Sequence, residues 1–296
     1  MWILWTLLSV FSWSLVNVLD SVLVHRFEKH PLALMWSQSL VSVPILIVLS
    51  FFLPLQVSWI PFLLVFGIIG YLGDVWFFHV LDHVDVSVSN IAWSILSLLL
   101  ALTGLLFFQE GWGVPQTLGA LLIVVGTFFL SFFHQKLNVQ KTLVLVCMLA
   151  TLYLPYYIAK KIAIDRGIPA ESVFFWMLAG REMTSILVPL FMSKVRYVAV
   201  QAMRGSYAFM LVNAIVIVLF LLAEFFGALA YQSGSLSLVA ITANVQPFMV
   251  MGIAWVFLRI KPSHSARELL TRQSVVVKII SFSIVFLGLA LLTFSH

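Results

Sequence analysis

The chain has 296 residues, of which 62% are hydrophobic and only 9% are charged, and its mean hydropathy is +1.12. A soluble domain carries about 25% charged residues, so this composition excludes a water-facing globular surface and indicates a membrane protein. The net charge of +5 does not require a nucleic acid partner, because the basic residues fall between apolar runs, where membrane topology accounts for them. The single Cys147 excludes an internal disulfide.

Ten apolar runs follow one another along the chain. A spanning helix needs roughly 20 mostly apolar residues. Runs of this kind occur at 2–24, 32–53, 59–80, 86–108, 114–133, 142–162, 172–192, 206–231, 236–258 and 275–294. Polar or turn-forming residues break the pattern between them, and the segment 193–205 is one such break. No run has the polar face that a soluble helix presents to water. We therefore expect an all-α polytopic membrane protein with ten transmembrane helices.

The second half of the chain repeats features of the first half. Residues 78–91 align with residues 228–241 at an offset of 150, residues 125–132 align with 287–294, and Trp36 corresponds to Trp176. Five spans per half is an odd number, so the second half enters the membrane upside down relative to the first. Inverted-topology repeats are an architecture of secondary transporters, which hold substrate near the midplane. We expect two inverted five-helix repeats, at 1–135 and 136–296.

The segment 98–126 carries a resemblance to a known family. An apolar span ends in Phe108-Gln-Glu110, a short turn follows, Gln116-Thr-Leu-Gly119 opens the next span, and Gly126 lies seven residues further on. In this pattern, and in its two five-span halves, the chain resembles the EamA-like members of the drug/metabolite transporter superfamily. Arg181 also falls where that family often has an arginine.

Two features depart from the family pattern. The second half has Arg259-Ile-Lys-Pro262 where a Glu-bearing turn is expected, and the proline expected near the middle of the fourth span is absent at Trp93-Ser94. These departures leave the subfamily unassigned. The resemblance implies a secondary active transporter, an exporter of a small organic metabolite or drug, working by alternating access between its two halves and needing no cofactor.

Four ionisable residues lie near the centres of apolar runs: Asp74, Arg181, Glu182 and Glu224. A charge at the bilayer centre costs at least ~2.5–3.5 kcal/mol, so each is a candidate functional residue. Asp74 and Glu224 each lie eight residues before a polar break, or roughly 12 Å from a helix end, close to the middle of the bilayer core. The same two carboxylates differ by the offset of the repeat. The alternative is that each is a buried hydrogen-bond anchor between helices.

The charge balance at this level suggests a coupling ion or a positively charged solute. Arg181 and Glu182 are adjacent, so on a helix they point roughly 100° apart and should not pair, which leaves Arg181 to another carboxylate or to a substrate anion. Three carboxylates against one guanidinium leave two negative charges in excess. We expect a proton or a bound cation to neutralise at least one carboxylate. This predicts a cationic or zwitterionic substrate, proton coupling through Asp74 and Glu224, or both.

Further polar and aromatic residues are weaker candidates for the cavity. Asn244 and Gln246 lie next to a kink expected at Pro247 and would bind either substrate or a neighbouring helix. Aromatic residues that would line the cavity or face lipid are Trp76, Trp93, Trp176 and Tyr157. Asp20 and Lys160 lie late in matching spans, and because inversion places them at opposite membrane faces, we expect them not to pair.

The run His79-x-x-Asp82-His83-x-Asp85 has potential metal ligands at helical spacing. It sits where the third span ends, and polar residues are expected at such an end, so we predict no metal site. An alternative function rests on the same run: a membrane enzyme or lipid flippase with an interfacial site around His79–Asp85. The other alternative is a receptor that transports nothing. No nucleophile motif such as G-x-S-x-G appears.

Basic residues are unevenly distributed between the two sides of the predicted bundle. Twelve of the 16 Lys and Arg residues flank the connections after spans 1, 5, 7 and 9, whereas Lys160, Lys161 and Arg166 lie on the opposite side. The positive-inside rule makes the twelve-charge side cytoplasmic and both termini external. Ten-span members of the resembled superfamily are usually drawn with both termini inside, so the two expectations conflict. We expect a monomer or homodimer in the bacterial inner membrane.

Overall fold

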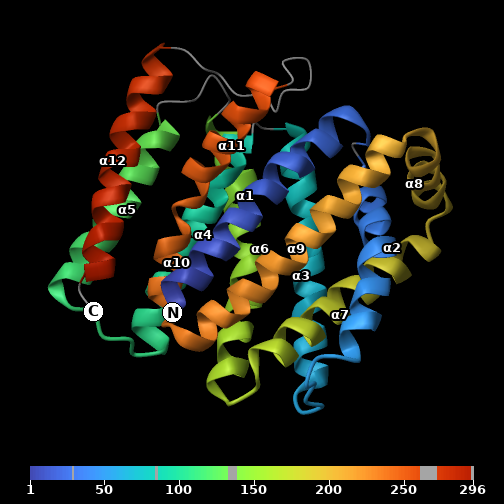
Figure 1. The fold of residues 1–296 in the computed structure, drawn as a ribbon, viewed down its shortest axis with the longest axis horizontal. Helices are drawn as coiled ribbons and strands as arrows, with labels where there is room; N and C mark the ends of the chain where they lie inside the picture. Colours follow the sequence, from blue (N-terminus) through green and yellow to red (C-terminus); the bar gives the residue numbers. More distant parts are fainter. Residues whose placement is uncertain (29, 84–85, 133–138, 261–271, 295–296) are drawn as a thin grey trace.

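The computed structural model describes residues 1–28, 30–83, 86–132, 139–260 and 272–294, and within these ranges the chain is helical with no β-strand (Figure 1). The helices are α1 (Trp2–Arg26), α2 (Pro31–Ser50), α3 (Ile60–His83), α4 (Val86–Phe107), α5 (Val114–Phe132), α6 (Val139–Asp165), α7 (Ala170–Leu190), α8 (Ser193–Gly205), α9 (Tyr207–Ser233), α10 (Leu236–Ala243), α11 (Gln246–Ile260) and α12 (Arg272–Phe294).

Seven segments in the described ranges are long and apolar enough to cross a membrane. They are α1, α2, α3, α6, α7, α9 and the stretch Leu236–Val256 that joins α10 and α11. Two shorter apolar helical stretches lie in α4 and α5. The predicted all-α membrane protein is therefore confirmed, and every predicted span coincides with a helix or, for 236–258, with a pair of helices. The number of ten crossings stays a prediction.

The segment 193–205 is not the simple break that the sequence predicted, because it forms the helix α8. Val195 and Ala199 are buried and pack against Ala33 at the start of α2. The charged Lys194 and Arg204 are exposed. Basic residues lower the average hydropathy of this stretch, which hides an amphipathic helix from a search for apolar runs. In Figure 1, α8 stands at the edge of the bundle beside α2 and α9.

The predicted ninth span is interrupted, as its proline indicated. Helix α10 ends at Ala243, and α11 begins at Gln246 with Pro247 as its second residue. Proline has no backbone N–H to donate, and it is well suited to the first turn of a new helix. The kink expected at this position is confirmed, and it turns the chain beside the polar residues in the centre of the protein.

The helices pack mainly in pairs from different halves of the chain. Helix α1 lies against α9, α3 against α6 and α7, α4 against α6 and α10, and α5 against α12. The α5–α12 pair stands side by side at one edge of Figure 1. One large core cluster joins α1, α2, α3, α4, α6, α7, α9, α10 and α11. The buried charged residues lie within this core.

Helices α3 and α7 cross at two glycines. A Cβ on Gly67 would collide with the carbonyl oxygen of Met177, and a Cβ on Gly180 would collide with the backbone of Leu64. Without side chains at these points, the two backbones come into direct contact, which is how small residues bring membrane helices together. Gly180 immediately precedes Arg181, so this crossing sets the distance between Arg181 and α3.

Candidate functional site

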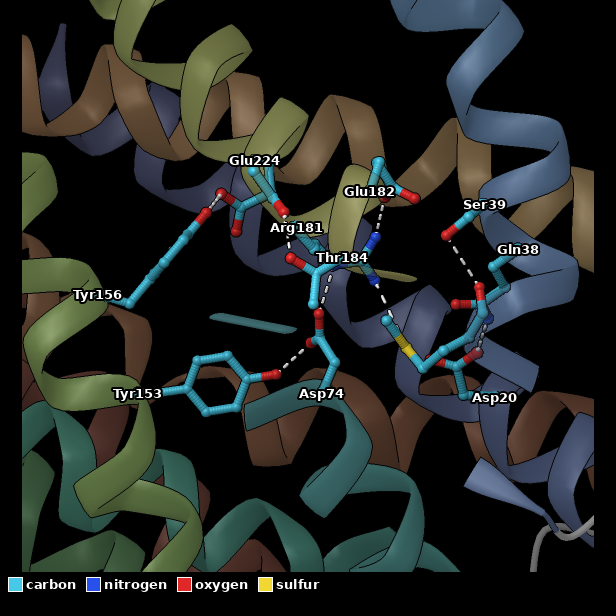
Figure 2. Close-up of polar contacts among 12 residues, drawn as sticks. Asp20, Gln38, Ser39, Asp74, Tyr153, Tyr156, Arg181, Glu182, Thr184 and Glu224 are labelled. Atoms are coloured by element: carbon cyan, nitrogen blue, oxygen red, sulfur yellow. Dashed lines mark hydrogen bonds and ion pairs between the residues drawn. The ribbon is translucent and has the colours of Figure 1, made fainter. Parts of the chain in front are cut away.

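All four midplane residues predicted from the sequence are buried. Their exposed fractions are 7% for Asp74, 4% for Arg181, 1% for Glu182 and 3% for Glu224. Figure 2 shows three of them in direct contact, with Arg181 between the carboxylates of Asp74 and Glu182. Glu224 belongs to a neighbouring polar cluster with different partners.

Arg181 links helices α3 and α7 through two ion pairs. Its Nε donates to Asp74 on α3, and its Nη1 donates to Glu182 on its own helix. The guanidinium carbon lies over the ring of Phe220, 4.2 Å from the ring centre. The expectation that Arg181 and Glu182 do not pair is wrong. The arginine side chain is long enough to turn back along the helix, and its planar group presents donors on two edges at once.

Helix α6 contributes a tyrosine to this cluster. The hydroxyl of Tyr153 donates a hydrogen bond to Asp74. The ring of Tyr153 reaches this position because it lies over Gly73 on α3, 3.0 Å from where a Cβ would stand. Any larger residue at position 73 would push the ring away. Asp74 therefore accepts from one tyrosine and one cation.

Glu224 on α9 has the same two kinds of partner. It accepts from the Lys160 ammonium at 2.6 Å and from the Tyr156 hydroxyl at 2.7 Å, and both donors come from α6. The Lys160 ammonium also lies 4.7 Å from the centre of the Tyr156 ring and 5.2 Å from that of Tyr157. Cation–π contacts of this kind favour a buried ammonium. Figure 2 shows Tyr153 and Tyr156 approaching their carboxylates from the same side.

Sequence reasoning missed Lys160 as a site residue. It was counted with the loop cations of one membrane face, yet it is only 1% exposed. A signal was present, because Tyr153, Tyr156, Tyr157 and Lys160 follow the spacing of one helix face. The expected charge balance changes as a result, since Lys160 neutralises Glu224. The prediction that Asp20 and Lys160 do not pair holds in the described residues, where Asp20 instead accepts from Gln38.

A cavity of about 60 Å³ opens beside the Glu224–Lys160 pair. This volume holds a few water molecules. Polar and aromatic groups on its wall include Glu224, Lys160, Tyr157, Trp93, Trp13 and Gln246. The Nε1 of Trp93 and the Nε2 of Gln246 are buried and have no hydrogen-bond partner among the described residues. Two donors are thus available to a molecule in the cavity.

The other secondary candidates lie elsewhere. Asn244 is buried in the break before α11 and is not part of the cavity wall. Trp76 donates to the carbonyl of Leu145 at 3.1 Å, and Trp176 donates to the carbonyl of Gln56 at 2.8 Å, so both indoles fasten neighbouring segments. The His79 ring contacts the His83 ring in a tilted arrangement, with ring centres 4.4 Å apart.

No group of three potential metal ligands occurs in the part of the chain that the structure describes. The predicted run His79–Asp85 ends at a residue, Asp85, that lies outside the described ranges. Instead, the Nδ1 atom of His83 lies 2.8 Å from the carbonyl oxygen of His79, one helical turn earlier.

Glu110 joins the two halves of the chain at another point. It lies in the turn between α4 and α5, and it accepts from the backbone N–H groups of Leu236 at 2.6 Å and Ser237 at 2.9 Å. These are the first two residues of α10, whose unpaired N–H groups favour a carboxylate. The hydroxyl of Ser237 donates to the same carboxylate. Glu110 therefore caps α10, which gives a physical reason for an acidic residue in this turn.

Two comparisons with known proteins found a similarity. The profile of the EamA-like transporter family matches residues 1–132. No curated protein matches the chain. A solved structure titled only "Crystal structure of protein" is similar over 98% of this chain and 96% of that chain, with a TM-score of 0.64 and 16% identity, a likeness that shows the fold alone. The chain is thus an integral membrane protein whose residues 1–132 are similar to the EamA-like transporter family.

Proposed function

We propose that the protein is a secondary active transporter of a small zwitterionic or cationic organic solute. The observation that carries this proposal is a buried ion pair, Glu224 with Lys160, on the wall of a cavity between helices from both halves of the chain. Ionisable residues inside a membrane protein mark substrate and ion pathways. A structural ion pair would have no need of adjoining free space.

The cavity suits a zwitterion best. An ammonium group on the solute would replace Lys160 at the Glu224 carboxylate, and a carboxylate on the solute would take up the Lys160 ammonium. The buried donors of Gln246 and Trp93 would complete the hydrogen bonds of that carboxylate. The rings of Tyr157 and Trp93 would pack against the rest of the solute. A strongly anionic solute is disfavoured, because among the described residues Lys160 is the one cation on this wall and Glu224 already pairs with it.

We further propose that the chain is an inverted repeat, with halves at 1–135 and 136–296 that move against each other in alternating access. Helix contacts support this. In the proposed repeat, the counterparts of α1, α2, α3, α4 and α5 are, in that order, α6, α7, α9, the pair α10–α11 and α12. Replacing each helix by its counterpart turns the α1–α9 contact into an α6–α3 contact, and the α4–α6 contact into an α10–α1 contact. All of these contacts occur. Helices α5 and α12 exchange with each other and touch. Gly126 and Gly288, which align in the repeat, both lie in that interface.

We also propose that the protein exports its solute and couples this export to protons. It would lie in a bacterial inner membrane with both termini outside. The orientation rests on the excess of basic residues along one face, to which α8 contributes Lys194, Arg196 and Arg204. A C-terminal tag that protease removes from intact cells supports external termini, whereas a protected tag supports the usual orientation of the superfamily.

Transport is tested with purified protein in liposomes. Labelled amino acids, polyamines and other zwitterions are screened for exchange across the membrane, and Glu224→Gln and Lys160→Met are compared with the wild type. We expect both variants to lose exchange. The matched control is Asp165→Asn, which alters a carboxylate that is 43% exposed at the end of α6 and lies outside the cavity. Unchanged exchange by Glu224→Gln would overturn the proposed site.

A further inference from the structure

A second, smaller chamber lies on the other side of an aromatic wall. Its volume is about 10 Å³, and its polar lining includes Asp20 on α1, Gln38 on α2, Asp74 on α3, Tyr153 on α6 and Arg181 on α7. Trp13 and Trp93 line both this chamber and the larger cavity, so their rings stand between the two. The ring centres of these tryptophans are 6.2 Å apart. The polar centre of the protein is therefore divided into two compartments.

Asp20 is the one carboxylate of this region that has no cation partner among the described residues. It is only 4% exposed. Its Oδ1 accepts from the Nε2 of Gln38 at 3.1 Å. Figure 2 shows Asp20 and Gln38 on the far side of Arg181 from the tyrosines. Arg181 is already held by Asp74 and Glu182.

The excess negative charge of the protein centre lies on this side of the wall. Glu224 and Lys160 balance each other in the larger cavity. In and beside the smaller chamber, Asp20, Asp74 and Glu182 face a single guanidinium. A buried ionised carboxylate without a partner is strongly unfavourable. One or more of these carboxylates must therefore take up a neutralising cation.

We propose that Asp20 is a proton-binding site of the transporter, distinct from the solute site at Glu224 and Lys160. A proton that reaches Asp20 from water converts its carboxylate into a carboxylic acid, and no other bond changes. A proton fits better than a metal ion, because a chamber of about 10 Å³ has room for about one water and the Arg181 guanidinium forms part of its wall. The role of Asp20 in coupling rests on the proposed transport function.

The position of Asp20 suggests how its proton would be coupled to movement. When Asp20 is ionised, it competes with Asp74 for Arg181; when it is protonated, Arg181 stays with Asp74. Asp20 and Asp74 lie on α1 and α3 in the first half, whereas Arg181 lies on α7 in the second half. Titratable groups on the neighbouring helices are Tyr71 on α3, Tyr153 on α6, Glu182 on α7 and Glu224 on α9. The proton on Asp20 thereby biases an ion pair between the two halves.

Infrared difference spectroscopy tests the proton directly and needs no solute. Purified full-length protein in lipid nanodiscs is titrated with acid and base, and the C=O band of protonated carboxyl groups is recorded. We expect Asp20→Asn to remove one such band, Asp20→Glu to retain a shifted band, and the exposed-site control Asp165→Asn to leave it unchanged. A band that survives in Asp20→Asn would overturn the proposal. A band that sodium chloride removes at constant pH, while choline chloride does not, would assign the site to Na⁺ and would also overturn it.

A transport assay separates this inference from the proposed function. In liposomes, Asp20→Asn is expected to lose solute accumulation driven by a pH gradient and to keep solute exchange at equal pH, whereas Glu224→Gln loses both. Loss of exchange in a monodisperse Asp20→Asn protein would place Asp20 in the solute site and refute the separation. If the wild type transports none of the solutes screened, the proposed function fails, while the infrared result still decides whether Asp20 binds a proton.

Discussion

Replacing Lys160 with methionine removes one partner of the buried ion pair and leaves the other in place. Methionine keeps most of the length and apolar surface of the lysine stem, so the change is mainly one of charge. Glu224 would retain its hydrogen bond from Tyr156 at 2.7 Å and lose the ammonium at 2.6 Å. The variant therefore measures what the ion pair contributes to stability.

The expected loss follows from the geometry. At 2.6 Å and an effective dielectric constant of about 20, two unit charges attract by about 6 kcal/mol. Burial of both charges offsets part of this attraction. Removing one partner of a buried pair costs about 3–5 kcal/mol, because the remaining charge is left uncompensated. We expect Lys160→Met to lose this amount, and the double variant Lys160→Met with Glu224→Gln to lose much less than the sum of the single variants.

The assay is reversible unfolding of the purified protein in mixed micelles, followed by tryptophan fluorescence, for the wild type, both single variants and the double variant. Lys194→Met on α8 is the matched control, since Lys194 is exposed and its loss should change stability by less than ~0.5 kcal/mol. Additive effects in the double-mutant cycle would refute the reasoning. So would a Lys160→Met protein as stable as the control.

Three further outcomes follow from single contacts. Gly180→Leu should separate α3 from α7 and break the Asp74 ion pair. In the same unfolding assay it should destabilise the protein by more than ~3 kcal/mol, and Gly180→Ala should show a smaller effect of the same sign. Glu110→Ala should cost about 1–2 kcal/mol by uncapping α10, and Glu110→Gln should recover part of it in the same assay. Tyr156→Phe should cost about 1.5–3 kcal/mol by removing a hydrogen bond to Glu224, and a loss equal to that of a surface Tyr197→Phe variant would contradict this.

The membrane class and the burial of four charged residues could be predicted from the sequence, for a simple reason. Lipid offers no hydrogen bonds, so a chain in a membrane must form apolar helices of a fixed minimum length, and these are visible as runs of letters. Any charge inside such a run is conspicuous. Asp74, Arg181, Glu182 and Glu224 were found in this way, and all four are buried.

Side-chain reach was harder to predict. The pairing of Arg181 with Glu182 was wrongly excluded because helix geometry fixes where a side chain starts and not where a long one ends. Lys160 was placed late in the span 142–162 and counted with the basic residues of one membrane face, yet α6 extends to Asp165 and buries it. The amphipathic helix α8 was missed because only one face of it is apolar.

The sequence by itself determined that the protein is a bundle of membrane helices and that four charged residues lie in its interior, and it showed a resemblance to the EamA-like transporters in overall layout and in the segment 98–126. Which of these side chains pair with each other was decided only by the tertiary structure. Glycines of α3 let Tyr153 and Tyr156 lie close enough to reach two carboxylates, and the approach of α1 to α4 placed Trp13 and Trp93 between the two cavities. Contacts between helices depend on which faces meet, and a single sequence records the residues on a face without recording what that face touches.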